Sequence, residues 1–283
     1  MKVFDTAESM RAWSEEERAS GKTIGFTPTM GALHAGHESL MCAAAEQNDL
    51  SVVSIYVNPT QFAPDEDFDR YPRTFDADCE MASRAGARAI YAPPNSVMYP
   101  EGYATYVDVE RITAGLCGAS RPHFFRGVTT VVTKLFNAVR PHRAYFGQKD
   151  AQQAAVIRRM TRDLDLGIEI VEMPIVREPD GLAMSSRNKY LSPEERRRAL
   201  CLSRGLFEAR AMLEAGERHP QTIIEAVRKA MSGVEIDYVE LVDAEEIAPV
   251  DRVRGTVLLA AAALVGQTRL IDNIKFTAHE TEE

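Results

Sequence analysis

The sequence has no apolar run long enough to cross a membrane as a helix. The longest uninterrupted run, residues 257–265, contains nine residues, whereas a transmembrane helix needs about 20. Residues 1–13 also lack the apolar core of a secretory signal peptide. We therefore expect a soluble protein that remains in the cytoplasm.

Cysteine is scarce, and its four copies lie far apart at Cys42, Cys79, Cys117 and Cys201, with no C-x-x-C pair. This spacing argues against a structural zinc site, which usually needs closely spaced ligands, and against a disulfide scaffold. Their apolar surroundings do not mark any of them as a nucleophile, so we expect small core residues.

Positive charge is also in short supply. The chain has 33 Lys and Arg residues against 42 Asp and Glu residues, a net charge of −9. Nucleic acid is therefore not expected as the main partner, although a basic pocket for a small anion remains compatible with an acidic surface. The sequence also contains no G-x-x-x-x-G-K-[ST], no G-x-G-x-x-G after its first predicted strand and no G-x-S-x-G.

What is present is an ordinary globular composition, with 45% hydrophobic and 27% charged residues over 283 positions. This length favours two domains. In the first half, short apolar runs alternate with helical patterns. We predict strands at residues 24–27, 51–57, 88–92, 144–146 and 168–173, and helices near residues 36–48, 74–85, 127–139 and 152–164. Such alternation predicts a parallel sheet covered by helices on both faces, with ligands at the carboxyl ends of its strands.

The pattern changes in the last third of the chain. Ser192 followed by Pro193 and two glutamates is a strong helix start, and apolar residues at helical spacing then continue until Gly216. A second helix at residues 221–231 and strands at 238–242 and 257–263 follow. We therefore predict an α/β fold in two parts: a parallel-sheet domain over residues 1–176 and a smaller α+β domain over residues 177–283.

The most informative segment is T-P-T-M-G-A-L-H-A-G-H at residues 27–37. It follows a predicted strand and opens a helix, where backbone N–H groups and the helix dipole favour phosphate. His34 and His37 are three residues apart and share one helix face. Two imidazoles placed there are able to donate hydrogen bonds to a triphosphate. The alternative is a capped helix that carries two surface histidines.

Three further polar segments carry chemistry suited to anions. A-M-S-S-R-N at residues 183–188 offers hydroxyls and a guanidinium that suit phosphate, although the same residues also occur in solvated loops. F-G-Q-K-D at residues 146–150 places Lys149 at a predicted strand end, where a solvated lysine is the alternative. V-N-P-T-Q-F at residues 57–62 contributes Asn58 and Gln61, whose amides suit hydroxyl and carboxylate groups; a simple Asn-Pro turn is the alternative.

Together, these segments resemble the pantothenate synthetase family of pantoate–β-alanine ligases. The resemblance extends over almost the whole chain and includes Y-P-R-T at residues 71–74, F-G-Q-K-D-A-Q-Q at 146–153, D-G-L-A-M-S-S-R-N at 180–188 and R-L-I-D-N at 269–273. It implies the Rossmann-like fold of the nucleotidyl-transfer superfamily, which also holds class I aminoacyl-tRNA synthetases. The implied reaction is an ATP-dependent condensation of pantoate with β-alanine through a pantoyl adenylate, releasing pyrophosphate and AMP.

The resemblance also implies roles for individual residues. His37 stands at the position of the proton donor, and His34, Lys149 and Arg187 would neutralise the reacting phosphate. Gln61 and Gln153 would bind pantoate, Gln61 would also meet β-alanine, and Asp78 would lie near Mg²⁺. The implied ATP site comprises Met30, Gly31, Ala32, Leu33, His34, Ala35, Gly36, His37, Gly147, Gln148, Lys149, Asp150, Val176, Met184, Ser185, Ser186 and Arg187. A homodimer is implied as well.

Three positions depart from the family pattern. Gln148 stands where Glu is usual, Ala151 where an aromatic residue is usual, and Phe124 at a histidine position. Two alternatives stay open. One is a nucleotidylyltransferase of the same superfamily, which stops after nucleotide transfer. The other, motivated by the three departures, is a nucleotide-binding regulator without catalysis. The Gln61 loop and the Ser-Ser-Arg segment favour the ligase.

Overall fold

The computed structural model describes residues 1–64 and 66–278, which divide into two compact units. The first unit consists of Met1–Glu110, Arg121–Gly147 and Val156–Pro174. The second begins its main part at Ile175 and also takes in two segments from the first half of the chain, Arg111–Ser120 and Gln148–Ala155. We expected one division after residue 176, which would place both segments in the first part. Contacts between residues distant in sequence group them with the second unit instead.

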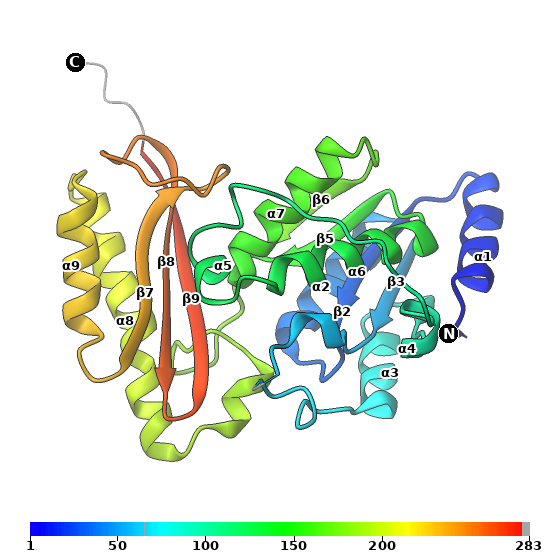
Figure 1. The fold of residues 1–283 in the computed structure, drawn as a ribbon, viewed down its shortest axis with the longest axis horizontal. Helices are drawn as coiled ribbons and strands as arrows, with labels where there is room; N and C mark the ends of the chain where they lie inside the picture. Colours follow the sequence, from blue (N-terminus) through cyan, green and yellow to red (C-terminus); the bar gives the residue numbers. More distant parts are fainter. Residues whose placement is uncertain (65, 279–283) are drawn as a thin grey trace. The chain divides into compact units, whose positions relative to one another are not determined.

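The first unit is built on a six-stranded sheet in which every pairing is parallel, in the order β1-β4-β3-β2-β5-β6 (Figure 1). Its strands are β1 (Lys2–Phe4), β2 (Ile24–Thr29), β3 (Leu50–Ile55), β4 (Ala89–Tyr91), β5 (Arg143–Gly147) and β6 (Glu169–Met173). The predicted parallel sheet is confirmed. The short edge strand β1 and the helix after it were not predicted.

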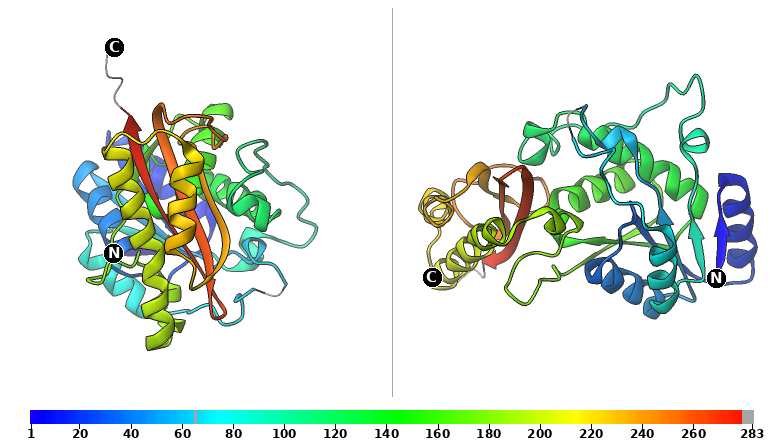
Figure 2. Two further views of the ribbon diagram at one scale, coloured as in Figure 1. Left: turned by 90° about the vertical axis from the view of Figure 1, so that its left-hand side faces the viewer. Right: turned by 90° about the horizontal axis from the view of Figure 1, so that it is seen from below.

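Helices cover both faces of this sheet (Figure 2). They are α1 (Ala7–Ala19), α2 (Ala35–Gln47), α3 (Phe75–Arg84), α4 (Asn95–Met98), α6 (Phe124–Val139) and α7 (Ala151–Asp163). Neighbouring residues of β2 show the two faces. Gly25 lies against Asn48 at the end of α2, whereas the Phe26 ring contacts Phe136 of α6 with centroids 6.2 Å apart. Both faces are therefore buried, which explains the continuous apolar strands.

The order of the strands locates the ligand-binding edge of the first unit. From β2 the chain moves outward through β3 and β4 on one side, and then returns to β5 on the other side of β2. Open parallel sheets bind ligands at the carboxyl ends of the strands where the order reverses in this way. Thr29, the last residue of β2, and Gly147, the last residue of β5, flank that point.

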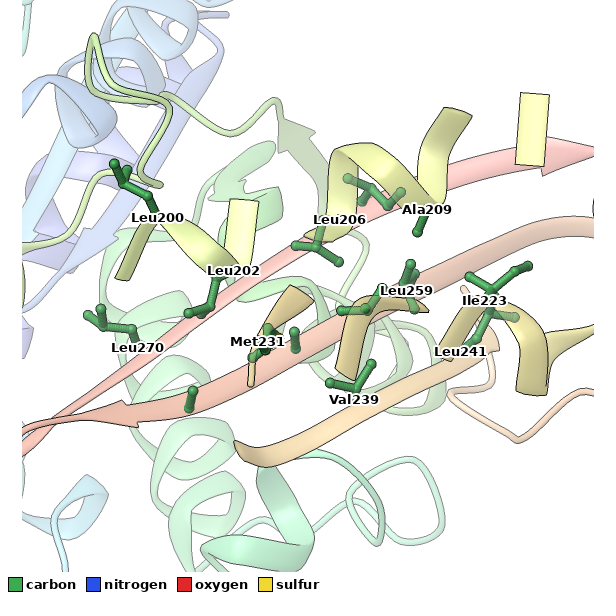
Figure 3. Close-up of a cluster of buried hydrophobic side chains, with 14 of the residues drawn as sticks. Leu200, Leu202, Leu206, Ala209, Ile223, Met231, Val239, Leu241, Leu259 and Leu270 are labelled. Carbon is green, nitrogen blue, oxygen red and sulfur yellow. The ribbon is translucent and has the colours of Figure 1, made fainter. Parts of the chain in front are cut away.

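The second unit packs two helices on a three-stranded antiparallel sheet. It contains α5 (Cys117–Ser120), α8 (Pro193–Glu214), α9 (Pro220–Ala230), β7 (Glu235–Asp243), β8 (Gly255–Val265) and β9 (Thr268–Ala278). The predicted helix start is confirmed as a capping box, in which Ser192 accepts from the Glu195 amide and Glu195 accepts from the Ser192 amide. Leu206 of α8, Leu241 of β7 and Leu259 of β8 meet in its core (Figure 3).

Strand β9 was not predicted. Two consecutive polar residues, Asp272 and Asn273, interrupt its apolar alternation, and both are only 3% exposed. The strand forms because it pairs along its whole length with β8, a contact between chain segments rather than a local preference. Within residues 1–64 and 66–278, none of the helices combines the length and apolar character that a membrane crossing requires.

Candidate active site

The segment after β2 has an unusual backbone. Gly31 and Ala32 both lie in the left-handed region, with φ of +77° and +49°. A Cβ at Gly31 would come within 2.9 Å of the Asp78 carboxylate, so only glycine fits there. The Gly31 amide donates to Thr29 Oγ1 (3.1 Å), and this hydroxyl in turn donates to the Ser54 carbonyl (2.6 Å). The turn is thereby fixed to β2 and β3.

Asp78 fastens the same turn from the side of α3. Its carboxylate accepts hydrogen bonds from the amides of Ala32 (3.0 Å) and Leu33 (2.8 Å), and from the Thr74 hydroxyl (3.1 Å). The residue is 2% exposed. Among the described residues, no group of three or more His, Cys, Asp or Glu side chains forms a metal site. The contacts of Asp78 are those of a residue that shapes the loop, and its implied place near Mg²⁺ stays a prediction.

Replacement of this carboxylate provides a direct test of the shaping role. Asp78→Asn keeps the size but turns an N–H group toward one of the two amides, so a buried donor loses its acceptor. We expect the free energy of unfolding to fall by about 1–3 kcal/mol, measured by urea denaturation. Asp76→Asn is the matched control, because Asp76 is exposed in the same helix turn. Equal losses in the two variants would show that only the charge at the helix N-terminus matters.

The two histidines follow this fixed turn and lie at the start of α2. His34 is the N-cap residue, and its Nδ1 accepts the Gly36 amide (3.1 Å). In this arrangement the proton of the neutral ring is on Nε2, which makes that atom a hydrogen-bond donor. The His37 ring lies against it, with centroids 4.1 Å apart. The two rings thus lie side by side at the switch point of the sheet, at a helix start whose dipole favours negative charge.

The segment after β3 brings in Gln61, which is 8% exposed. Its Oε1 accepts a hydrogen bond from Asn58 Nδ2 (2.9 Å), and the same Asn58 group also donates to the Gly127 carbonyl (3.2 Å). The acceptor side of the Gln61 amide is thereby engaged, so its NH₂ group is the side available to an oxygen ligand. Gly127 is required here, because a Cβ would collide with the Thr60 carbonyl.

Arg121 is a neighbour of this segment that sequence reasoning missed. Its guanidinium binds both oxygens of Glu66 and donates to the Gln61 carbonyl (2.8 Å). It also lies over the Phe124 ring, with Cζ 3.9 Å from the centroid. The unusual Phe124 therefore supports the arginine that holds the Gln61 backbone. The signal in the sequence was the R-P-H-F-F run at residues 121–125, which places an arginine three residues before an aromatic side chain.

In the second unit, Gln152 and Gln153 begin α7 but differ in their surroundings. The Gln152 amide is 7% exposed and is held by three backbone groups: it donates to the Ile112 and Gly115 carbonyls and accepts from the Cys117 amide. It ties the segment 111–120 to the helix. Gln153 makes none of these bonds and is half-buried. Just before them, Lys149 lies 3.8 Å from Asp150 in an ion pair, and its side chain is 23% exposed.

Two predicted ATP-site residues, Val176 and Met184, are joined by a backbone hydrogen bond. The Met184 amide donates to the Val176 carbonyl (3.0 Å), which closes a narrow hairpin over residues 176–184. Immediately afterwards, Ser185 caps a 3-10 segment, Ser186–Tyr190, by accepting the Arg187 amide (3.3 Å). The predicted site residues thus fall into two groups, one around the Met30–His37 loop in the first unit and one around Lys149 and the hairpin in the second.

The cysteines supply no obvious nucleophile. All four are free, and Cys117 is 9% exposed. Burial raises the pKa of the thiols of Cys42, Cys79 and Cys201. A raised pKa keeps a thiol protonated at neutral pH and weakens it as a nucleophile.

A parallel sheet with a histidine-bearing helix N-terminus at its switch point defines a nucleotide-binding α/β protein. Comparison with known proteins identifies the family. The profile of the family described as pantoate-beta-alanine ligase matches residues 2–275. The chain therefore belongs to this family and is a ligase that joins pantoate to β-alanine. The resemblance seen in the motifs is confirmed.

The matches to named relatives cover nearly the whole length of both chains. Pantothenate synthetase from Acetivibrio thermocellus is 53% identical over 278 residues, covering 97% of this chain and 99% of the relative. The Thermotoga petrophila protein of the same name is 55% identical, with 96% and 99% covered. Among solved structures, pantothenate synthetase from Thermus thermophilus superposes with a TM-score of 0.91 at 42% identity, covering 97% and 99%. A Francisella tularensis pantoate-beta-alanine ligase, complexed with β,γ-ATP and β-alanine, gives 0.77 at 29% identity, with 97% of both chains covered.

Proposed function

We propose that this ligase uses ATP to activate pantoate as an acyl adenylate and then transfers the pantoyl group to β-alanine. In the first step a pantoate carboxylate oxygen attacks the α-phosphorus and pyrophosphate leaves. In the second step the β-alanine nitrogen attacks the acyl carbon, AMP leaves and the nitrogen gives up a proton. The relative complexed with β,γ-ATP and β-alanine supports this choice of substrates.

The observation that carries the proposal is the start of α2 at the sheet's switch point. His34 is capped so that its Nε2 donates, and His37 stacks on it one turn into the helix. We assign His37 as the donor to the phosphate oxygen on which charge develops, and His34 as its neighbour in the same cradle. Residues 30–36 are assigned to line the triphosphate at the start of this helix, where the helix dipole favours negative charge.

The remaining assignments follow the chemistry of each side chain. Lys149 and Arg187 are proposed to neutralise phosphate oxygens, with Ser185 and Ser186 as hydroxyl donors. Gly147, Gln148, Asp150, Val176 and Met184 complete the nucleotide site. Gln61, whose Oε1 is already engaged by Asn58, donates its NH₂ group to pantoate and later to β-alanine, and Gln153 is the second pantoate ligand. None of these roles requires a covalent nucleophile from the protein.

Magnesium is proposed as the ion that accompanies the ATP phosphates, with Asp78 near it, because Mg²⁺ is commonly bound through one or two carboxylates together with substrate phosphates. A homodimer is proposed on the family resemblance alone. A cytoplasmic location is proposed from that resemblance together with the four free thiols, which suit a reducing compartment.

Positional isotope exchange tests the two-step reaction. ATP labelled with ¹⁸O in the bridge between its α- and β-phosphates is incubated with enzyme, Mg²⁺ and pantoate but without β-alanine. We expect the label to scramble, because reversible formation of the adenylate frees pyrophosphate to rotate. Scrambling that appears only when β-alanine is added would argue for a single concerted step and against the adenylate.

The same assay tests the pantoate assignment. Gln153→Ala is expected to suppress the exchange while leaving the dissociation constant of ATP within about twofold, because its amide is assigned to pantoate. Arg162→Ala, an exposed position near the other end of α7, is the control and should exchange like the parent enzyme. An equal loss of ATP binding in Gln153→Ala would move that residue into the nucleotide site.

A further inference from the structure

Two consecutive residues of β9 in the second unit bind the two segments to which phosphate contacts have been assigned. Asn273 Nδ2 donates to the carbonyls of Gln148 (2.9 Å) and Lys149 (3.0 Å). Its Oδ1 accepts from Gln148 Nε2 (3.2 Å). One asparagine side chain therefore makes three hydrogen bonds to the Lys149 segment and is itself only 3% exposed.

The preceding residue, Asp272, binds the hairpin that leads to Arg187. Both of its oxygens accept from the Arg177 guanidinium (2.6 and 2.9 Å), and Arg177 also donates to the Gly181 carbonyl (3.1 Å) within the hairpin. The Arg177 guanidinium lies over the Phe207 ring of α8, 4.8 Å from its centroid. Asp272 Oδ1 further accepts the backbone N–H of Asn273 (2.7 Å), so the Asp272 side chain also fixes the backbone that carries Asn273.

Their position on the strand explains why two neighbours serve different segments. Successive side chains of a strand point to opposite faces of the sheet. Leu270 and Ile274 belong to the core beneath α8 and α9, so Asp272 lies on that face and Asn273 on the other. β9 also pairs with β8 along its whole length, which gives both residues a rigid base. The hairpin and the Lys149 segment are thus fixed to one strand from its two faces.

We propose that Asp272 and Asn273 are positioning residues. They fix the Lys149 segment and the hairpin leading to Arg187 relative to each other, so that both cationic side chains can bind phosphate. The second unit then sets the spacing of two cationic side chains that come from segments nearly forty residues apart. This inference rests on the proposed phosphate roles of Lys149 and Arg187. It also accounts for the membership of residues 148–155 in the second unit.

Asn273 is the sharper residue to test, because its substitution leaves the buried Arg177–Asp272 ion pair intact. Asn273→Ala removes all three hydrogen bonds, and Asn273→Asp keeps the shape but cannot donate to the two carbonyls. We expect both variants to slow adenylation by about 10- to 100-fold, since two half-buried carbonyls lose their donors and the Lys149 segment loses its fixed position. Thr277→Val on the same strand is the control. The Thr277 hydroxyl is hydrogen-bonded to the Thr256 hydroxyl (3.0 Å), away from the Lys149 segment, and the rate of this variant should stay within about twofold.

Two further readouts separate positioning from a general loss of structure. Aminolysis of pantoyl adenylate supplied to the enzyme uses no pyrophosphate contacts, so we expect Asn273→Ala to keep that half-reaction. In a Lys149→Ala background, Asn273→Ala should add less than about twofold to the adenylation defect, because it acts through a side chain that is already absent. Loss of both half-reactions, or full additivity, would overturn the proposal.

The inference and the function on which it rests fail in different ways. If Lys149→Ala slows adenylation but both Asn273 variants retain normal rates, the positioning role is wrong and the phosphate assignment stands. If Lys149→Ala itself adenylates normally, the assignment of Lys149 fails and the positioning role fails with it. Normal adenylation by Asn273→Asp together with a slow Asn273→Ala would show that side-chain shape, not the pair of donated hydrogen bonds, is what matters.

Discussion

His37→Ala is expected to lower kcat by about 10²- to 10³-fold, because removal of one preorganised donor to a developing negative charge has an effect of that size. His37 lies in the first turn of α2 with its ring against His34, so the substitution leaves the N-cap bond from the Gly36 amide to His34 in place. The helix should therefore form normally, and the KM for ATP should change much less than kcat.

The controls for His37 use the same helix. His37→Gln retains an N–H donor of similar reach and should recover part of the lost rate, whereas Glu46→Ala, exposed near the other end of α2, should behave as the parent enzyme. The rate is measured as AMP formation with all three substrates, after circular dichroism has shown an unchanged fold. A folded His37→Ala enzyme with the parent kcat would remove this histidine from the mechanism.

Lys149→Ala is expected to reduce kcat/KM for ATP by about 10²-fold or more. Its ammonium is assigned to phosphate oxygens that gain charge as pyrophosphate departs, and fixed positive charge is the main means of catalysis in phosphoryl and nucleotidyl transfer. The side chain is partly buried and its nearest ion-pair partner, Asp150, lies 3.8 Å away. Asp150 is thus a weak competitor for the charge. Pantoate binding should be nearly unchanged.

Charge-matched variants make this second expectation specific. Lys149→Arg keeps the charge but spreads it over a planar group, so it should retain more activity than Lys149→Ala. Lys229→Ala removes a lysine that is exposed on α9 and should leave both rate and affinity unaltered. The measurement is the initial rate of pyrophosphate release at varied ATP, with pantoate binding followed by calorimetry. A parent-like ATP dependence of Lys149→Ala would remove the 147–150 segment from the phosphate site.

Local patterns in the sequence were sufficient for the larger part of the fold. Buried strands such as β3 and the capped start of α8 depend on apolar runs, Pro positions and caps that act over a few residues. The strand-to-helix segment with His34 and His37 was likewise visible, because its glycine and histidine spacing is local. These features needed no knowledge of the partners against which they pack.

Only the tertiary structure decided which residues distant in sequence contact each other at the candidate site. Asp78 proved to shape the Gly31–Leu33 turn across more than forty positions of sequence, and only packing distinguished Gln152 from Gln153 on α7. Asn273 reaches Gln148 across 125 positions. No periodic pattern encodes such bonds. They arise because folding brings buried polar groups together from separate segments, and each must then find a partner to offset the loss of water.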